Sequence, residues 1–169
     1  MTELVPRERL QPSLLDRLID DDPGSAQEPV ERRVLSRSQM RAAVLRDLTA
    51  LLNCTRLSDR DNLLAAAVHA GNSVLNYGVP SFSGETAASI EVSDIERAVR
   101  EAIIRFEPRI LPDSLVVSAI LDDSMLDWHN LVSLKISGLL WAQPVPLEML
   151  IRTTLDLETG QVELFELSK

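Results

Sequence analysis

Two pairs of carboxylates are the residues best suited to acid and base chemistry in this chain. Glu107 with Asp113, and Asp122 with Asp127, lie close enough in the sequence to meet across a cleft. A glycosidase needs such a pair about 5–9.5 Å apart, with one carboxyl holding its proton. Arg109 beside Glu107 would instead stabilise the ionised carboxylate. The two tryptophans and the single tyrosine are also scattered, so no sugar-binding wall is indicated and glycosidase activity is disfavoured.

Histidine chemistry is equally weakly supported. The two histidines, His69 and His129, stand sixty residues apart, and neither accompanies an evident nucleophile. His69 lies in an Ala-rich segment, where a partly buried or interface side chain is expected. The alternative is a metal site that joins Asp122, Asp127 and His129, because carboxylates and imidazoles are common metal ligands.

Cys54 and an acidic triplet each have a simpler structural interpretation. Cys54 is the only cysteine, it follows Leu51 and Leu52, and no basic cluster lies nearby, so we predict a buried thiol and no intramolecular disulfide. Asp20–Asp22 offers consecutive carboxylates, whereas a calcium loop spaces its ligands. We therefore interpret the acidic stretch up to about Arg33 as a flexible linker rather than a metal site.

The charged pair in Glu107-Pro108-Arg109 has a different chemistry, that of a polar contact. Pro108 has no N–H and clashes with the preceding turn, so a helix should end near Phe106 and leave Glu107 outside helical dihedrals. In an extended segment residues two apart share a face, which would project Glu107 and Arg109 together, with Ile110 on the other side. Arginine can fork onto a carboxylate, so this pair suits binding to another protein.

Amphipathic helices should precede this triplet. Ser93 and Glu96 predict a capping box for one helix, and Ser36 and Gln39 for an earlier one. Apolar residues at spacings of three and four form a stripe on each: Ile95, Val99, Ala102, Ile103 and Phe106 on one, and Met40, Val44, Leu48, Leu51 and Leu52 on the other.

Three further segments complete the helical part of the chain. Residues 12–19 predict a short helix with Leu14, Leu15, Leu18 and Ile19 on one side, too short to be stable unless it docks on its own domain or on a partner. Residues 59–69 predict another helix, ended by Gly71 and Asn72. Residues 76–84 predict a loop anchored by Tyr77 and Phe82.

After Pro112 the period of the apolar residues changes to two, which is typical of strands. Residues 115–121 are apolar enough for a buried central strand, and residues 131–140 alternate as a strand with one wet face. Residues 143–146 interrupt the pattern with two prolines, and a hairpin around residues 158–160 follows. The sequence thus predicts an α+β fold, with helices packed on one face of a small, mainly antiparallel sheet of about four strands.

Composition bounds the function. With 169 residues we expect an N-terminal short helix and flexible acidic linker (residues 1–33) and a single α+β domain (residues 34–169). The formal net charge of −9 argues against nucleic acid, because phosphate contacts need a basic surface. We found no apolar run near the roughly 20 residues of a membrane helix, so we expect a cytoplasmic protein without direct membrane insertion.

Several segments together resemble one family. Residues 106–110 resemble the Glu-Pro-Arg motif of the baseplate wedge proteins of contractile-tailed phages and of type VI secretion systems, where the subunit is called TssE. Residues 13–18 are similar to the N-terminal motif of that family, residues 44–53 to its first long helix, and residues 73–80 to its central loop motif. Each segment is short, but their shared order and spacing make the resemblance fairly specific.

The resemblance implies a non-catalytic structural subunit of the type VI secretion baseplate wedge. It implies a place in a six-fold hetero-oligomeric assembly docked at the inner membrane, with the wedge subunits TssF, TssG and TssK and the sheath subunits TssB and TssC as partners. Glu107, Pro108 and Arg109 would contact the wedge, and no cofactor or metal is implied. Family members are also thought to offer strands on which the first sheath ring assembles.

One alternative of another class remains at this point. A small regulatory adaptor of the same fold would bind one soluble partner, with its N-terminal helix and acidic linker as a docking arm. Neighbouring genes for a sheath pair and large wedge proteins would favour the baseplate interpretation.

Overall fold

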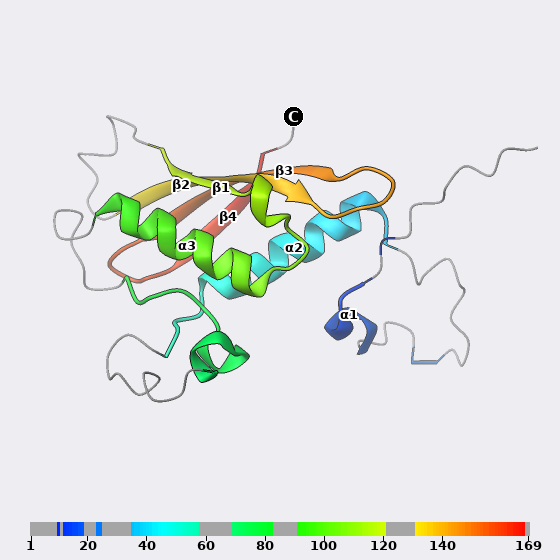
Figure 1. Ribbon diagram of the computed structural model, residues 1–169, viewed down its shortest axis with the longest axis horizontal. Coiled ribbons are helices and arrows are strands. Elements are labelled where there is room, and N and C mark those ends of the chain that lie inside the picture. The colour runs from blue at the N-terminus through cyan, green and yellow to red at the C-terminus, as the bar shows by residue number, and fades with distance from the viewer. Residues whose placement is uncertain are drawn as a thin grey trace, which may run out of the picture.

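The described part of the chain folds as three α-helices and one four-stranded antiparallel sheet (Figure 1). The computed structural model describes residues 10, 12–18, 23–24, 35–57, 69–82, 91–120 and 131–167. The elements are α1 (Leu14–Leu18), α2 (Arg37–Leu52), α3 (Val92–Phe106), β1 (Val116–Ala119), β2 (Leu131–Leu140), β3 (Leu147–Asp156) and β4 (Val162–Glu166). The predicted α+β class is confirmed, whereas the predicted domain boundary at residues 33 and 34 stays a prediction.

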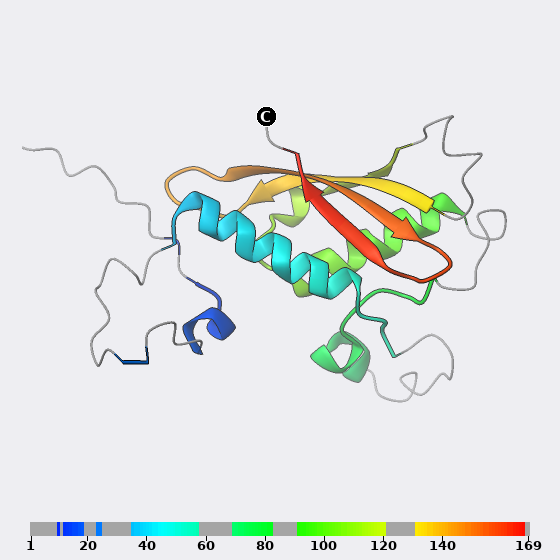
Figure 2. The ribbon, with the colours of Figure 1, turned by 180° about the vertical axis from the view of Figure 1, so that it is seen from behind.

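The sheet is a meander in the order β1-β2-β3-β4, and α2 and α3 lie on the same side of it (Figures 1 and 2). The two hairpin turns fall where the sequence predicts them, at residues 141–146 and 157–161. The prediction of a buried central strand near residue 116 is wrong, because β1 is an edge strand and Val116 is 56% exposed. On the outer edge of β1, the Ala119 N–H has no strand partner among the described residues and donates instead to the Glu96 carboxylate of α3 at 2.6 Å.

Helix α2 begins with the predicted capping box. The Gln39 N–H donates to Ser36 Oγ at 3.2 Å, and the Ser36 N–H donates to Gln39 Oε1 at 2.8 Å. The predicted apolar stripe is buried along its whole length: Met40, Val44, Leu48, Leu51 and Leu52. The helix ends before Asn53, so Cys54 falls outside it and its side chain is exposed. The prediction of a buried thiol is therefore wrong.

Helix α3 confirms the predicted end but not the predicted start. It begins at Val92 with Glu91 as N-cap, and no side chain caps its first N–H groups. The predicted capping box is wrong because Ser93 already lies in the first turn and Glu96 is engaged by β1. The helix ends at Phe106, and Glu107 leaves helical dihedrals with φ −119° and ψ 78°, as expected before a proline.

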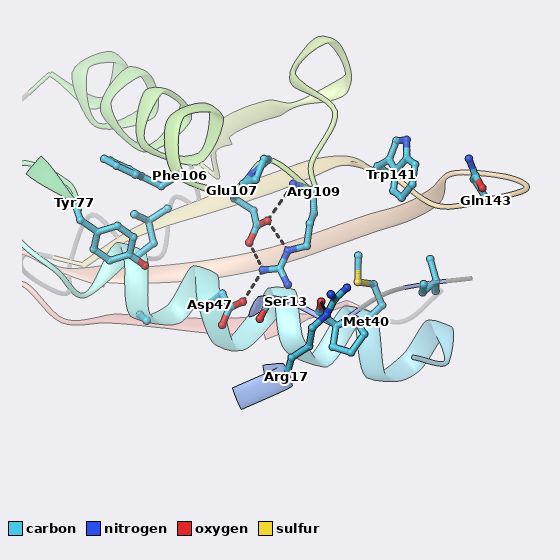
Figure 3. A pocket seen from close by; sticks show the side chains of 15 residues that line it. Ser13, Arg17, Met40, Asp47, Tyr77, Phe106, Glu107, Arg109, Trp141 and Gln143 are labelled. Atoms are coloured by element: carbon cyan, nitrogen blue, oxygen red, sulfur yellow. Dashed lines mark hydrogen bonds and ion pairs between the residues drawn. The ribbon is translucent and has the colours of Figure 1, made fainter. Parts of the chain in front are cut away.

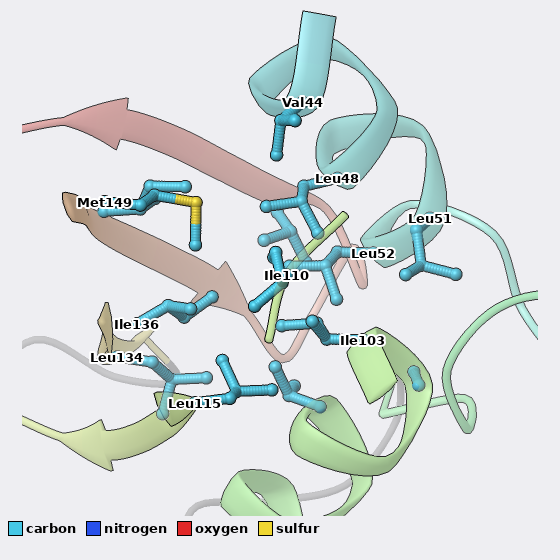
Figure 4. Close-up of a cluster of buried hydrophobic side chains, with 14 of the residues drawn as sticks. Val44, Leu48, Leu51, Leu52, Ile103, Ile110, Leu115, Leu134, Ile136 and Met149 are labelled. Atoms are coloured by element: carbon cyan, nitrogen blue, oxygen red, sulfur yellow. The ribbon is translucent and has the colours of Figure 1, made fainter. Parts of the chain in front are cut away.

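The core lies between the two long helices and the sheet (Figure 4). Alternate residues of β3 face it, so that Leu147, Met149, Ile151, Thr153 and Leu155 are buried while their neighbours on the strand are half-buried or exposed. Fully burying a large aliphatic side chain stabilises the fold by about 1.5–3 kcal/mol. The predicted stripes are therefore core, which holds α2 and α3 in fixed positions under the sheet.

The segments before α3 match their predictions in part. Phe82 is buried and the Tyr77 ring packs edge-on against Phe106, with centroids 5.1 Å apart, which confirms both anchors. Most of the helix predicted over residues 59–69 lies outside the described residues, and 3₁₀ turns occupy Ala70–Asn72 and Val74–Asn76. Helix α1 forms, but Leu14 is 76% exposed and Leu18 74%, so these side chains are not docked on the domain.

Candidate functional site

The Glu-Pro-Arg triplet forms a tight turn directly after α3. The Glu107 carbonyl accepts the Ile110 N–H at 3.2 Å, so the chain reverses here instead of running extended. The expectation of an extended segment is wrong. The chain turns here because the residues after the turn are held against the end of β2 by the bridge between Ile110 and Leu140.

Backbone hydrogen bonds fix this turn to the sheet. Ile110 pairs with Leu140 as an isolated antiparallel bridge. The Trp141 N–H donates to the Arg109 carbonyl at 2.7 Å, and the Leu111 N–H donates to the Leu139 carbonyl at 2.9 Å. The turn is therefore held between the end of α3, which precedes it in the chain, and the end of β2, to which it is hydrogen-bonded.

Glu107 and Arg109 project to the same side, as predicted, but they point into the molecule. Glu107 is 4% exposed, and the Arg109 side chain is 18% exposed. Arg109 Nε donates to Glu107 Oε1 at 2.6 Å, and Arg109 Nη2 pairs with Glu107 Oε2. Pro108, between them, is exposed. The sequence-based picture of a protruding charged pair is thus wrong, and its proposed role in partner binding needs a different geometry.

A carboxylate on α2 explains why the pair turns inward. Arg109 Nη2 lies 2.6 Å from Asp47 Oδ2, so the guanidinium sits between two carboxylates from different elements (Figure 3). Buried charges persist only when they are paired and hydrogen-bonded, and here one arginine satisfies Glu107 and Asp47 together. Asp47 therefore links the turn to α2.

The ion pairs continue from Asp47 to the N-terminal helix. Arg46 Nη2 lies 2.8 Å from Asp47 Oδ1, and Arg46 Nη1 lies 2.7 Å from Asp16 Oδ1 on α1. Alternating charges thus run without interruption through the set that we call the ion-pair chain: Glu107, Arg109, Asp47, Arg46 and Asp16. Sequence reasoning missed its last three members, since their pairing depends on the packing of α1 and α3 against α2.

The pKa values of Arg109 and Asp16 shift in the direction that their pairing requires. Burial lowers the pKa of Arg109, but hydrogen bonds and attraction from Glu107 and Asp47 outweigh it and hold the pKa above its ordinary value. The hydrogen bonds from Arg46 and Ser13 lower the pKa of Asp16. These shifts favour the charged forms of Arg109 and Asp16, so the arrangement suits structural pairing rather than proton transfer.

A groove with mostly apolar walls lies beside the triplet. Its volume is about 880 Å³, and it is lined by all three triplet residues, by Asp47 and Ala50 of α2, and by residues of the N-terminal arm including Ser13 and Arg17. Met40, Tyr77, Phe106 and Trp141 supply apolar and aromatic surface (Figure 3). Arg109 Nη1 is buried there and has no hydrogen-bond partner among the described residues. The groove therefore offers mainly apolar and aromatic surface.

The candidate catalytic and metal residues do not converge within the described part of the chain. Glu107 is engaged by Arg109, whereas Asp113 and His69 are exposed. Asp122, Asp127 and His129 lie outside the described residues. Among the residues that the structure describes, no group of three histidine, cysteine or acidic side chains is placed to hold a metal ion. None of the helices in this part of the chain is long and apolar enough to cross a membrane.

Comparison with protein families agrees with this geometry. Residues 38–145, more than half of the chain, match the family model described as baseplate wedge protein gp25. The chain belongs to this family. The match covers nearly all of α2, the triplet and β2, and it confirms the family resemblance inferred from the short motifs, although residues 13–18 lie outside it. No curated protein and no solved structure matches the chain.

Membership in the baseplate wedge family supports a structural role in a phage tail-like baseplate, with other baseplate subunits as partners. The buried triplet agrees with such a role, because its charges hold elements of the protein together.

Proposed function

We propose that this protein is a non-catalytic subunit of a type VI secretion baseplate wedge, which links the wedge subunits TssF, TssG and TssK. The family match supports the baseplate part of this proposal. The motif pattern over residues 13–18, 44–53, 73–80 and 106–110 resembles the family that phage and type VI baseplates share, which is compatible with the type VI assignment.

The observation that carries the proposal is the groove next to the triplet. Tyr77, Phe106 and Trp141 give it aromatic surface, and Trp141 is half exposed although its ring is large. Aromatic side chains dominate the energetics of many protein interfaces. A wedge subunit would insert apolar side chains here and place a carbonyl or carboxylate near Arg109.

In this proposal Glu107 and Arg109 shape the interface more than they enter it. Their mutual ion pair and the contact with Asp47 fix the turn, which presents the exposed Pro108 at the rim of the groove. A rigid, preformed surface costs less ordering entropy when a partner binds. The triplet thus contributes to binding through Pro108 and through the geometry of the groove wall.

The same proposal includes a role in starting the sheath. β1 and β4 are the two edges of the described sheet, and an edge strand can accept a strand from another chain. Edge pairing with TssB or TssC would then extend this sheet into the first sheath ring.

The test blocks the groove without changing the core. Ala50 and Ala42 are both exposed on α2, but only Ala50 lines the groove. Ala50→Arg should fill the groove, and Ala42→Arg adds the same side chain elsewhere on the helix. Tagged wild-type protein, purified from its native host, should retain TssF and TssG. Ala50→Arg should retain at least tenfold less, and Ala42→Arg should match the wild type.

Circular dichroism must first show that both variants are folded. Equal retention by Ala50→Arg and Ala42→Arg would exclude the groove as the contact. If wild-type protein retains no wedge subunit, the type VI assignment fails and the adaptor interpretation gains.

A further inference from the structure

The sheet face opposite α2 and α3 carries an unusual arrangement of charge. No described helix covers this face, which both views of the ribbon show (Figures 1 and 2). Lys135 on β2 and Arg152 on β3 are directly opposite in register, so their side chains share this face. Like charges directly opposite each other in a sheet destabilise it. Within the described part of the chain, neither residue forms an ion pair.

Exposed apolar side chains also lie on this face. Phe165 is the register partner of Arg152 on β4 and is 54% exposed. Leu167 and Val116, on the same face, are also exposed. Phe165 and Leu167 lie two residues apart at the β4 edge of the sheet, whereas Val116 lies on the opposite edge strand, β1. Exposed apolar side chains beside a basic pair that has no ion pair among the described residues indicate an interaction site.

A shallow hollow adjoins Lys135 on this face. Its volume is about 420 Å³, and the open-face residues that line it include Lys135, Ser137, Leu139, Glu148, Leu150 and Leu167. The small side chain of Ser137 forms part of the hollow, and leucines surround it. One apolar side chain of a partner would fit there, within reach of the basic pair.

We propose that this open face binds an acidic, amphipathic segment of a partner protein, with an apolar side chain in the hollow and carboxylates on Lys135 and Arg152. Charge complementarity selects this occupant, since the chain carries a net charge of −9 and yet places two adjacent cations here. Glu163 opposes Thr154 and is therefore a diagonal neighbour of Arg152, whereas Glu148 lies four residues from Arg152 along β3. Both would repel carboxylates placed further out on this face. The partner's acidic residues would therefore bind only at the centre of the face, beside Lys135 and Arg152.

This surface is separate from the groove beside the triplet, because the hollow and the groove share no lining residue and the hollow reaches α2 only at Arg41. The proposal therefore does not depend on the proposed wedge contact. Two cations are also too few for a nucleic-acid surface, where binding rests on many phosphate contacts.

A crosslinking experiment in the native host tests the proposal. Phe165 is replaced by the photoreactive residue p-benzoylphenylalanine in the full chain, and the crosslinked peptide is identified by mass spectrometry. The expected product is a protein segment of net negative charge that contains at least one large apolar residue. Lys135→Glu should lower its yield at least tenfold. Arg97→Glu makes the same charge change on an exposed site of α3 and should leave the yield within twofold.

Each other outcome overturns the proposal. These are the absence of a protein crosslink, a crosslink to lipid, a segment of net positive charge, or equal yields from Lys135→Glu and Arg97→Glu. Lys135→Ser guards against misfolding, because it removes the opposed charges without adding a new one. This variant should melt no lower than the wild type and still lose most of the crosslink.

Discussion

Arg109 and Asp47 stand 62 residues apart in the sequence and are joined by an ion pair of 2.6 Å. Arg109 belongs to the turn that follows α3, and Asp47 belongs to α2. The contact therefore ties the turn after α3 to the middle of α2, and both segments line the groove. Because the same guanidinium holds Glu107, the conformation of the triplet depends on where α2 lies.

Substitution of Arg109 should destabilise the fold. Arg109→Glu would place a third carboxylate next to buried Glu107 and Asp47. Removing one partner of a buried ion pair costs about 3–5 kcal/mol, because the remaining charge stays buried. Urea denaturation followed by circular dichroism should show a loss of this size in the free energy of unfolding. If the pair protruded into solvent, as the sequence suggested, this substitution would change the stability little, but the burial of Glu107 argues against that.

Arg46→Met is the matched control for this experiment. Arg46 belongs to the same ion-pair chain, but half of its side chain is exposed. Exposed ion pairs contribute about 0–1 kcal/mol, so the loss should stay within that range. An equal urea midpoint for Arg109→Glu and wild type would mean that the buried pair does not stabilise the fold.

The contact between α1 and α2 should weaken in acid. The hydrogen bonds from Arg46 and Ser13 hold the pKa of Asp16 below its ordinary value of 3.8. A depressed pKa contributes stability that is complete above the unfolded-state pKa and is lost as the pH falls through the folded-state pKa. NMR titration of the Asp16 carboxyl should give a pKa below 3.8 in wild type. In Arg46→Met it should rise toward 3.8, and an unchanged pKa would exclude the ion pair as its main cause.

Much of the fold follows from periodicity. Met40, Val44 and Leu48 recur at a helical spacing and are buried, because a helix against a sheet must bury one stripe. The alternation over residues 131–140 gave β2 its full length, since a strand with one wet face leaves a period of two. The end of α3 was also predictable, because Pro108 excludes helical geometry at the residue before it.

The remaining features depend on contacts between segments that no local pattern encodes. Nothing near Glu107 in the sequence indicates that Asp47 will draw Arg109 inward. Likewise, Glu96 occupies the outer edge of β1 only because α3 packs beside that strand. The sequence of an apolar run such as residues 115–121 therefore does not indicate whether a second strand or a helix side chain covers the outer edge of the strand.

Gly78 should be irreplaceable, unlike Gly71. Gly78 has φ +118°, and a Cβ there would lie 2.2 Å from the Cys54 carbonyl oxygen. The Cys54 carbonyl group cannot move away easily, because its oxygen accepts a hydrogen bond from the Val79 N–H at 2.9 Å. Gly78→Ala should therefore lower the free energy of unfolding by about 1–3 kcal/mol or more. Gly71→Ala meets no atom within 4 Å and should change it little, as paired thermal melts would show.

A melting temperature of Gly78→Ala equal to that of Gly71→Ala would contradict this account. It would mean that the junction between Cys54 and Val79 relaxes without cost. The prediction also bears on the family resemblance, because Gly78 lies within the segment similar to the central loop motif.

Thr153 offers a stabilising substitution. Its side chain is fully buried, and Oγ1 has no hydrogen-bond partner among the described residues. It borders a void of about 10 Å³ that is at the lower limit of size for one water molecule, and the other residues that line it are apolar, so a water there would lack the polar partners it needs. Thr153→Val keeps the shape and removes an unsatisfied hydroxyl, so the free energy of unfolding should rise by about 1–3 kcal/mol. Thr154→Val, on the open face, should change it by less than about 0.5 kcal/mol. A lower urea midpoint for Thr153→Val than for the wild type would show that the Thr153 hydroxyl has a hydrogen-bond partner in the folded protein. A polar group would then have to lie beside the centre of β3.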